Sequence, residues 1–286
     1  MRLAILISPA AGWTYPEIRD LARDAEAAGL PTFWVSDHFF GGEGFPDRNC
    51  LEAWSLLAAL ARDTSTLRLG TLVTAHSYRN PAYLAKTVAS IDHLSGGRIE
   101  FGLGAGWKEN EYTAYGYEFP APGIRVTQLR ETLEICTRMW TEERATYTGK
   151  HSRIAGALCA PKPAQRPYPP ITIGGTKPRL MRTAARFADV FNIGRLGTPP
   201  QVPTRPMLLE LLEQLAAAAA SVGRERPLPV SHWTPVEQAL ERECEELART
   251  ASELSSLGIV EYQLAVPREN ARAVLERLIR GVLPAV

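Results

Sequence analysis

The chain has 286 residues, and its 32 basic and 31 acidic residues give a formal net charge of +1. This balance provides no basic field for a nucleic-acid backbone or an anionic membrane, so we expect the partner to be a small molecule. The four cysteines show no Cys-x-x-Cys spacing, and no apolar run reaches the roughly 20 residues of a membrane-spanning helix. These features predict reduced thiols and a cytoplasmic protein.

Short apolar runs rich in β-branched residues alternate along the chain with longer segments of helical period. Such alternation is typical of βα units around a parallel sheet. The runs number about eight, as a closed barrel requires. We therefore predict an α/β fold, a (β/α)₈ TIM barrel, formed by residues 1–286 as a single domain. The expected strands are 3–7, 32–36, 67–73, 99–103, 171–174, 190–193, 228–231 and 260–266.

The first predicted helix has the clearest boundaries. Thr14, Pro16 and Glu17 fit a capping box with proline in the first turn, and Gly29 is suited to end the helix. Residues 145–170, by contrast, contain five prolines and two glycines but show no helical period. We expect this segment to be an extended loop excursion between the fourth helix and the fifth strand, and to cover part of the site.

Three histidines follow predicted strands, at the barrel end where TIM-barrel active sites lie. His38 follows the second strand, directly after Asp37 and within an aromatic group. An imidazole there can donate or accept a proton near neutral pH, and Asp37 is placed to orient it, so we expect both residues to be catalytic. His76 and His232 follow the third and seventh strands. We assign them, with Phe39, a weaker role in substrate binding, although both histidines fit equally well as structural groups.

Two glycine-rich turns follow neighbouring strands and each precedes a helical segment. Such turns expose backbone N–H groups to an anion, and two of them side by side favour one shared phosphate. The first turn lacks the Gly-x-Gly-x-x-Gly spacing of a dinucleotide-binding Rossmann fold. The turn residues are Gly104, Ala105, Gly106 and Trp107 after the fourth strand, and Gly174, Gly175 and Thr176 after the fifth.

Clustered histidines also occur in zinc enzymes built on barrels. The chain contains neither His-x-His nor His-Glu-x-x-His, which are the usual local spacings of such ligands. We therefore expect no metal site.

Taken together, these motifs resemble the luciferase-like flavin and deazaflavin oxidoreductases. The resemblance runs from residue 2 to about residue 194 and is looser afterwards. Each segment is a weak signal by itself, but the order and spacing of the segments on successive βα units are specific. The segments are 34–38, 69–74, 80–86, 91–98, 102–112 and 173–176.

The resemblance implies that a cofactor ring lies across the C-terminal mouth of the barrel, with its phosphate on the two glycine turns and His38 facing the ring. In this family the bulge after the third strand often carries a non-prolyl cis peptide that supports the ring. The matching bond here joins Leu72 and Val73, and we expect these two residues and Thr74 to contact the cofactor. The family analogy also implies a homodimer.

The pattern over 104–112, followed by 116–120, looks most like family members that use the deazaflavin coenzyme F420. FMN-using relatives share much of this pattern, so FMN is the alternative cofactor. One departure concerns the substrate. The sugar-phosphate dehydrogenases of the superfamily place a glutamate where this chain has Trp107, which argues against a sugar-phosphate substrate.

A deazaflavin carries hydride and activates oxygen poorly, so the resemblance implies hydride transfer to or from a small, partly apolar organic molecule. His38 would donate a proton during reduction of a C=C, C=N or C=O bond, or remove one during oxidation of an alcohol. Two alternatives stay open. One is an FMN-dependent monooxygenase that consumes oxygen, and the other is a barrel that has lost catalysis and serves as a cofactor-binding or partner subunit.

Overall fold

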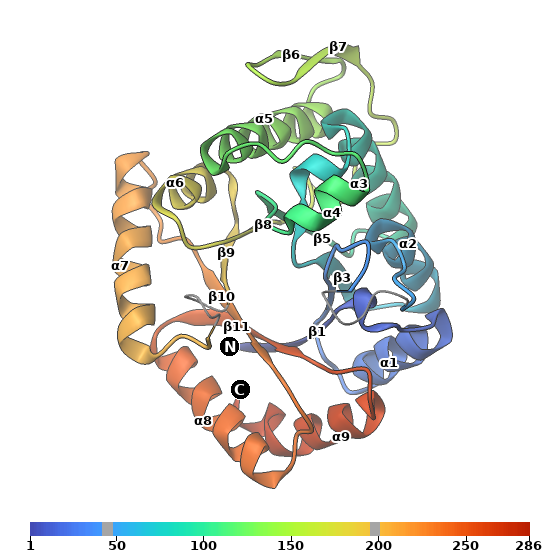
Figure 1. Cartoon of the computed structure of the whole chain (residues 1–286), viewed down its shortest axis with the longest axis vertical. Helices are drawn as coiled ribbons and strands as arrows, with labels where there is room; N and C mark the ends of the chain where they lie inside the picture. Colours follow the sequence, from blue (N-terminus) through green and yellow to red (C-terminus); the bar gives the residue numbers. More distant parts are fainter. Residues whose placement is uncertain (42–47, 195–200) are drawn as a thin grey trace.

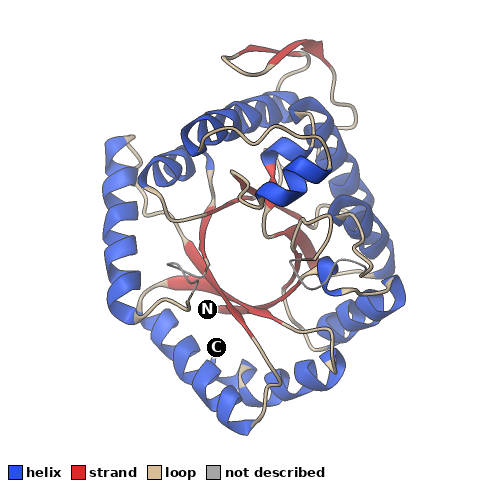
Figure 2. Ribbon diagram, viewed as in Figure 1, coloured by secondary structure: helices blue, strands red, loops and turns tan. Residues whose placement is uncertain are grey.

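A closed barrel of eight parallel strands forms the centre of the protein. The computed structural model describes residues 1–41, 48–194 and 201–286. The strands follow the order β3-β2-β1-β11-β10-β9-β8-β5, and pairing of β3 with β5 closes the ring, which is viewed down its axis in Figures 1 and 2. The predicted TIM barrel is confirmed. The strand bounds are β1 Arg2–Ile7, β2 Thr32–Val35, β3 Arg68–Thr71, β5 Ile99–Gly104, β8 Ile171–Gly174, β9 Val190–Ile193, β10 Val230–Pro235 and β11 Ile259–Ala265.

Two of the predicted strands differ from those in the structure. The run predicted at 67–73 ends early, and a short separate strand, β4 Thr74–Ala75, follows the bulge and pairs with β5. The run predicted at 228–231 begins two residues too soon and ends four residues too soon. Pro229 has no N–H to donate to a sheet, so β10 starts only at Val230.

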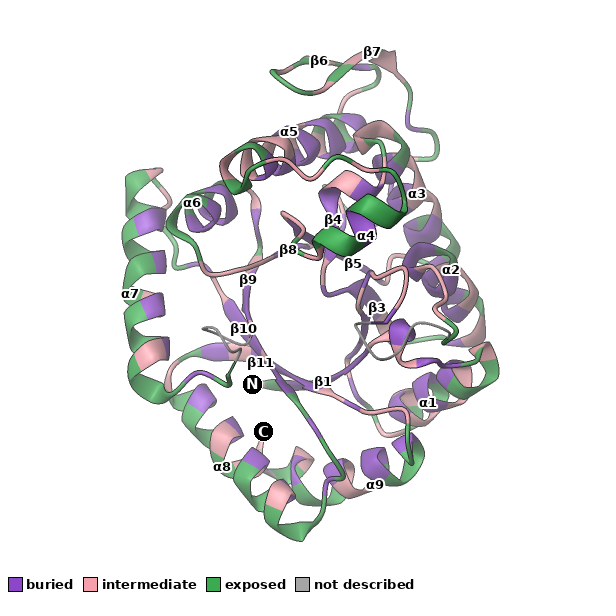
Figure 3. Ribbon diagram, viewed as in Figure 1, coloured by how far each residue is buried: buried purple, intermediate pink, exposed green. Residues whose placement is uncertain are grey.

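Helices surround the barrel on its outer side, and their buried residues face the strands (Figure 3). The first helix begins as predicted, because the Glu17 carboxylate accepts a hydrogen bond of 2.7 Å from the backbone N–H of Thr14. The helices are α1 Tyr15–Ala27, α2 Ala53–Asp63, α3 Pro81–Ser95, α4 Glu109–Ala114, α5 Pro122–Thr141, α6 Pro178–Phe187, α7 Arg205–Ser221, α8 Glu241–Ser256 and α9 Ala271–Gly281, with short 3₁₀ turns η1 Pro9–Ala11, η2 His76–Tyr78 and η3 Leu283–Ala285.

Side chains alternate along each strand between the barrel interior and the helices. In the interior, Asn192 donates hydrogen bonds to Ser231 (2.9 Å) and Gln263 (3.1 Å), and the Trp34 indole donates to Glu261 (2.9 Å). The interior is therefore filled with paired polar groups. Nearer the C-terminal mouth lies an apolar cluster formed by Ala4, Leu6, Trp34, Leu72, Val73, Trp233 and Ala265.

The predicted excursion over 145–170 is present, but its shape and position differ from the expectation. It forms an antiparallel hairpin of β6 Ala145–Thr148 and β7 Arg153–Ala157. The hairpin lies outside the ring of helices, beyond α5, and does not cover the mouth (Figure 1). It is held there by Glu131 of α5, whose buried carboxylate accepts hydrogen bonds from the backbone N–H groups of residues 150–152. The segment that stands at the mouth is α4, beside the ends of β5 and β8.

Among the residues described, no helix combines the length and the apolar character needed to cross a membrane. All four cysteines are free thiols.

Candidate active site

His38 lies at the mouth of the barrel in the loop that leaves β2. Its Nδ1 atom is 2.9 Å from Oε2 of Glu111, which is contributed by α4. An ionised carboxylate can only accept hydrogen bonds, so this contact places a proton on Nδ1 and leaves Nε2 as the edge that can exchange a proton with a ligand. The His38 side chain is 21% exposed, whereas that of Glu111 is fully buried.

Glu111 is at the centre of a dense hydrogen-bond network. Besides His38, its carboxylate accepts hydrogen bonds from the Tyr78 hydroxyl (2.7 Å), the Lys108 ammonium (2.8 Å) and the backbone N–H of Phe39 (3.0 Å). Burial alone would raise the pKa of Glu111, but the hydrogen bonds from His38, Lys108 and Tyr78 outweigh it and lower this pKa to about 2. The carboxylate is therefore ionised at neutral pH and fixed in position.

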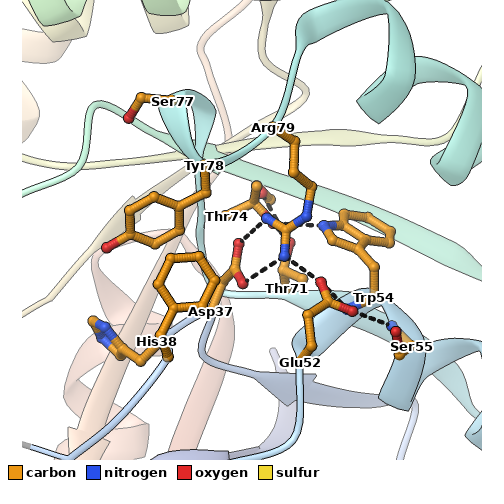
Figure 4. A network of polar contacts seen from close by, with 12 residues as sticks. Asp37, His38, Glu52, Trp54, Ser55, Thr71, Thr74, Ser77, Tyr78 and Arg79 are labelled. Carbon is orange, nitrogen blue, oxygen red and sulfur yellow. Dashed lines mark hydrogen bonds and ion pairs between the residues drawn. The ribbon is translucent and has the colours of Figure 1, made fainter. Parts of the chain in front are cut away.

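Asp37 does not orient the His38 imidazole, contrary to our expectation. Its carboxylate forms a bidentate ion pair with the Arg79 guanidinium, at 2.6 and 3.0 Å, and Glu52 contacts the same guanidinium. Figure 4 shows the Asp37 carboxylate directed toward Arg79, with the His38 ring on the other side. Consecutive residues leaving an extended strand point in opposite directions, which separates the two neighbours. The role predicted for Asp37 as the orienting group belongs to Glu111 in the structure.

His232 lies on the helix side of β10 and does not face the mouth. Its Nδ1 atom is 2.8 Å from the carbonyl oxygen of Ile193, its Nε2 atom is 3.2 Å from the Thr234 hydroxyl, and its ring stacks on Tyr262. Burial lowers the pKa of His232 to about 4. His232 does not project into the barrel interior, because the side chain that faces the interior there belongs to the preceding residue, Ser231. The expected substrate contact of His232 stays a prediction without support from this orientation.

His76 is also buried, in η2, with only 3% of its surface exposed. Burial, reinforced by the nearby Arg125 guanidinium, lowers the pKa of His76 to about 3, so the ring is neutral at physiological pH. Its Nε2 atom is buried and has no hydrogen-bond partner among the described residues, and the expected substrate contact of His76 stays a prediction.

The bulge after β3 has the backbone geometry that the resemblance implies, because the peptide bond between Leu72 and Val73 is cis. Val73 lies against both glycine turns: a Cβ atom added at Gly104 would be 2.6 Å from its Cγ2, and one added at Gly174 would be 3.3 Å from its Cγ1. Thr74 turns its side chain into the barrel wall, where its hydroxyl bonds to Trp54 and Thr71. Only the backbone of Thr74 is left to contact a ligand.

The two glycine turns fit a phosphate group. Gly106 and Gly175 have φ angles of +75° and +147°, and a Cβ atom added to either would lie within 2.1 Å of a neighbouring side chain. Within the described parts of the chain, the backbone N–H groups of Gly106, Trp107 and Thr176 have no hydrogen-bond acceptor. Unpaired N–H groups on two adjacent turns form the kind of cradle that binds an anion.

Sequence comparison identifies the family. The profile of the luciferase-like monooxygenases matches residues 1–279. The protein belongs to the luciferase-like monooxygenase family. An uncharacterized protein of Mycobacterium tuberculosis is 33% identical over 277 residues, covering 90% of both chains. The F420-dependent glucose-6-phosphate dehydrogenase of Kineococcus radiotolerans is 32% identical over 247 residues, covering 84% of this chain and 72% of that protein. The predicted family and its oxidoreductase class are confirmed.

Solved structures agree on the fold. A riboflavin lyase crystallised with modified FMN and riboflavin superposes with a TM-score of 0.81 at 16% identity, covering 99% of this chain and 90% of that one. An F420-dependent secondary alcohol dehydrogenase, in complex with an F420–acetone adduct, superposes with a TM-score of 0.72 at 20% identity, covering 98% and 84%. This luciferase-like barrel is therefore shared by proteins that hold different flavin-type groups.

Aromatic side chains border the site of this luciferase-like protein. The Trp107 ring, 72% exposed, meets the His38 ring edge-to-face with centroids 5.7 Å apart. Phe39 instead packs between Tyr78 and Tyr115, with centroids 4.4 and 4.1 Å away, and lines a groove on the outer side of α2 and α3. Trp107 is thus the aromatic residue placed beside the proton-exchanging histidine, and a substrate contact by Phe39 stays a prediction.

Metal-ligating side chains do not cluster in this family member. Within residues 1–41, 48–194 and 201–286, no three His, Cys, Asp or Glu side chains lie together as ligands of an ion would.

Sequence reasoning missed Glu111 and the two residues that help to fix it, Tyr78 and Lys108. The available signal was a glutamate-rich helical segment directly after the first glycine turn, at the mouth of the barrel. Its partner His38 lies 73 positions earlier in the chain, and only the closed barrel brings them together.

Proposed function

We propose that the protein is a coenzyme F420-dependent oxidoreductase. It transfers a hydride between the deazaflavin and a small, partly apolar organic substrate, and His38 is its proton donor and acceptor. The observation that carries this proposal is the geometry of the His38–Glu111 pair. A buried, ionised carboxylate holds Nδ1 at 2.9 Å, so that Nε2 is the edge free to exchange a proton at the mouth, beside two turns suited to a phosphate.

The cofactor would be held by residues that the structure already groups together. The N–H groups of Gly106, Trp107 and Thr176 would bind its phosphate, and Val73, between Gly104 and Gly174, would support its ring. When bound, the deazaflavin ring supplies or accepts the hydride. The F420-dependent relative at 32% identity supports this choice of cofactor.

His38 and Glu111 would have different roles in proton transfer. In the reducing direction, Nε2 of a protonated His38 donates its proton to the substrate atom that becomes a hydroxyl or amine, or to carbon. In the oxidising direction, Nε2 accepts the proton of an alcohol, and the adjacent Glu111 carboxylate stabilises the imidazolium that forms. Because Glu111 stays ionised throughout, it orients and stabilises the imidazole without exchanging a proton itself.

The surroundings of His38 favour an uncharged, partly apolar substrate. Trp107 stands beside the imidazole, and the mouth cluster around Leu6, Leu72 and Trp233 is apolar. Lys108, the cation next to the histidine, is already bound to Glu111 and to the carbonyl oxygens of Phe40 and Gly41. Lys108 is therefore not available to bind a substrate phosphate.

The alternative is an FMN-dependent monooxygenase, which is supported by the superposition on a protein that holds modified FMN. Equilibrium titration of the purified protein with oxidised F420 and with FMN, read by fluorescence, separates the two. We expect tight F420 binding and weak FMN binding, followed by oxidation of reduced F420 when carbonyl, imine or activated alkene substrates are added. Tight binding of FMN alone, with oxygen consumption, would establish the alternative. Binding of neither would overturn the cofactor site, and F420 binding without turnover of any substrate class would point to a non-catalytic subunit.

A further inference from the structure

A cluster of positive charge lies on the outer wall of the barrel, where α6 packs beside α5. A cavity of about 220 Å³ is hollowed between these helices and the end of α7. Apart from Thr183 and Val222, every side chain that lines it is an arginine. These are Arg130 from α5 and Arg179, Arg182 and Arg186 from α6.

The three arginines of α6 form a stripe along one face of the helix. Their spacing of three and then four residues places them above one another, and all three are exposed. At a rise of 1.5 Å per residue, the stripe from Arg179 to Arg186 extends about 10 Å along the helix. It is therefore longer than a single phosphate or carboxylate needs, and suits a chain that carries several anionic groups.

Little of this charge is neutralised within the protein. Arg130 pairs with Glu134 at 2.7 Å, and Arg179 donates a hydrogen bond of 2.7 Å to the Thr127 hydroxyl. Arg182 and Arg186 have no carboxylate partner in the part of the chain that the structure describes. A guanidinium binds a carboxylate through two parallel hydrogen bonds, so this stripe is best suited to successive carboxylates.

The stripe begins beside the second glycine turn. Only Lys177 separates Thr176, at the end of that turn, from Pro178, the first residue of α6. A ligand whose phosphate sits on the turn, and whose chain continues past the phosphate, can therefore run directly onto α6. F420 has this shape, since an oligo-γ-glutamate tail follows its phosphate, whereas FMN ends at the phosphate.

We propose that the arginine stripe of α6, formed by Arg179, Arg182 and Arg186 together with Arg130, binds the oligo-γ-glutamate tail of the cofactor. This inference rests on the proposed function, because it assumes that F420 occupies the mouth. It gives the outer wall of the barrel a role in cofactor affinity, at a distance from the reacting atoms.

The test compares F420 forms that carry no glutamate, a short tail and a long tail, each titrated into the wild type and into an Arg182→Gln/Arg186→Gln variant at low salt. We expect wild-type affinity to rise with tail length, by about tenfold between the tailless and long-tailed forms. In the variant this rise should disappear while the affinity for the tailless form is unchanged. Added salt should reduce the rise in the wild type, because the contacts are between exposed charges.

Arg242→Gln on α8 is the matched control, since Arg242 is an arginine that is 90% exposed and far from α6 in sequence. It should retain the full dependence on tail length. Equal wild-type affinity for all three forms, or a variant that keeps the rise, would overturn the tail site while leaving F420 as the cofactor. Failure of even the tailless form to bind the wild type would overturn the proposed function and the tail site together.

Discussion

Glu111 and Glu131 are both fully buried carboxylates, and each holds in place a segment that departs from the plain barrel. Among the described residues, Glu131 accepts hydrogen bonds only from backbone N–H groups, those of residues 150–152, and so anchors the β6–β7 hairpin to the outer wall. Glu111 lies in α4 at the mouth and accepts hydrogen bonds from three side chains, those of His38, Tyr78 and Lys108.

The difference shows how function can be separated from stability in this molecule. A carboxylate that bonds only to backbone amides fixes chain direction, whatever side chains the hairpin carries. A carboxylate that bonds to a titratable side chain also fixes which nitrogen of that side chain carries a proton. Only the second arrangement controls chemistry, and changes at the two positions should therefore affect different measurements.

The largest effect is expected from removing the proton carrier itself. His38→Asn should reduce turnover by about 10²–10⁴-fold, because proton transfer by a positioned side chain contributes that much to catalysis. Cofactor affinity should change little, since the glycine turns that would bind the phosphate are untouched. Steady-state kinetics together with a cofactor titration check this. Unimpaired turnover would mean that another group moves the proton.

Glu111→Gln is expected to have the next largest effect, a fall in turnover of about 10²-fold, because the amide no longer fixes the imidazole tautomer or stabilises the imidazolium. The ¹⁵N chemical shifts of His38 provide a readout that mere loss of stability would not change, and they should report a mixture of tautomers. Glu109→Gln, an exposed position on the same helix, is the control and should match the wild type. A variant of Glu111 with unchanged tautomer and rate would contradict the positioning role.

Glu131→Gln should act on stability alone. Weakening the hydrogen bonds to the hairpin should lower the free energy of unfolding by about 2 kcal/mol while turnover stays at the wild-type level. Urea denaturation and an activity assay on the same preparation measure both quantities. Glu142→Gln, near the exposed end of α5, should change neither. A large loss of activity after the change at Glu131 would remove the contrast with Glu111.

The two buried histidines should make the stability of the protein depend on pH. Burial, reinforced by Arg125, lowers the pKa of His76 to about 3. Burial also lowers the pKa of His232 to about 4. In the unfolded chain both histidines titrate near 6.5. The unfolded state then binds more protons below pH 6.5. The free energy of unfolding should decrease by up to about 1.4 kcal/mol per pH unit for each histidine as pH falls from 6.5 toward 4. Urea denaturation at several pH values tests this prediction. In the His232→Leu variant the free energy of unfolding should depend less steeply on pH than in the wild type. Parallel pH dependences for the two proteins would contradict it.

Much of the barrel could be predicted from local patterns. Alternating strands and helices specify a parallel barrel, and six of the eight predicted strands match the structure to within one residue at either end. The hairpin of β6 and β7 within residues 145–170 could not be foreseen, because its strands are short and its position depends on Glu131, which precedes it in another element. The expected cytoplasmic location and homodimer stay predictions.

The site was predicted less completely. Position at a strand end identified His38, but it does not reveal which way a side chain points. Strand-end position therefore also suggests a substrate contact for His232, although the two-residue period of β10 turns it toward the helices. The partnership of Asp37 with Arg79 and that of His38 with Glu111 join positions 42 and 73 residues apart. Such pairs are set by the closure of the barrel, not by neighbouring sequence.

Val73 packs against both Gly104 and Gly174, so the side chains that these three positions can accept depend on one another, although the positions lie on different segments. A methyl group at position 104 would need a smaller side chain at position 73. Substitutions here should therefore be tolerated in combinations and not singly, and the three positions should vary together among descendants of this chain. Libraries designed to change the cofactor or substrate of this barrel will sample the mouth effectively only if they randomise positions 73, 104 and 174 jointly.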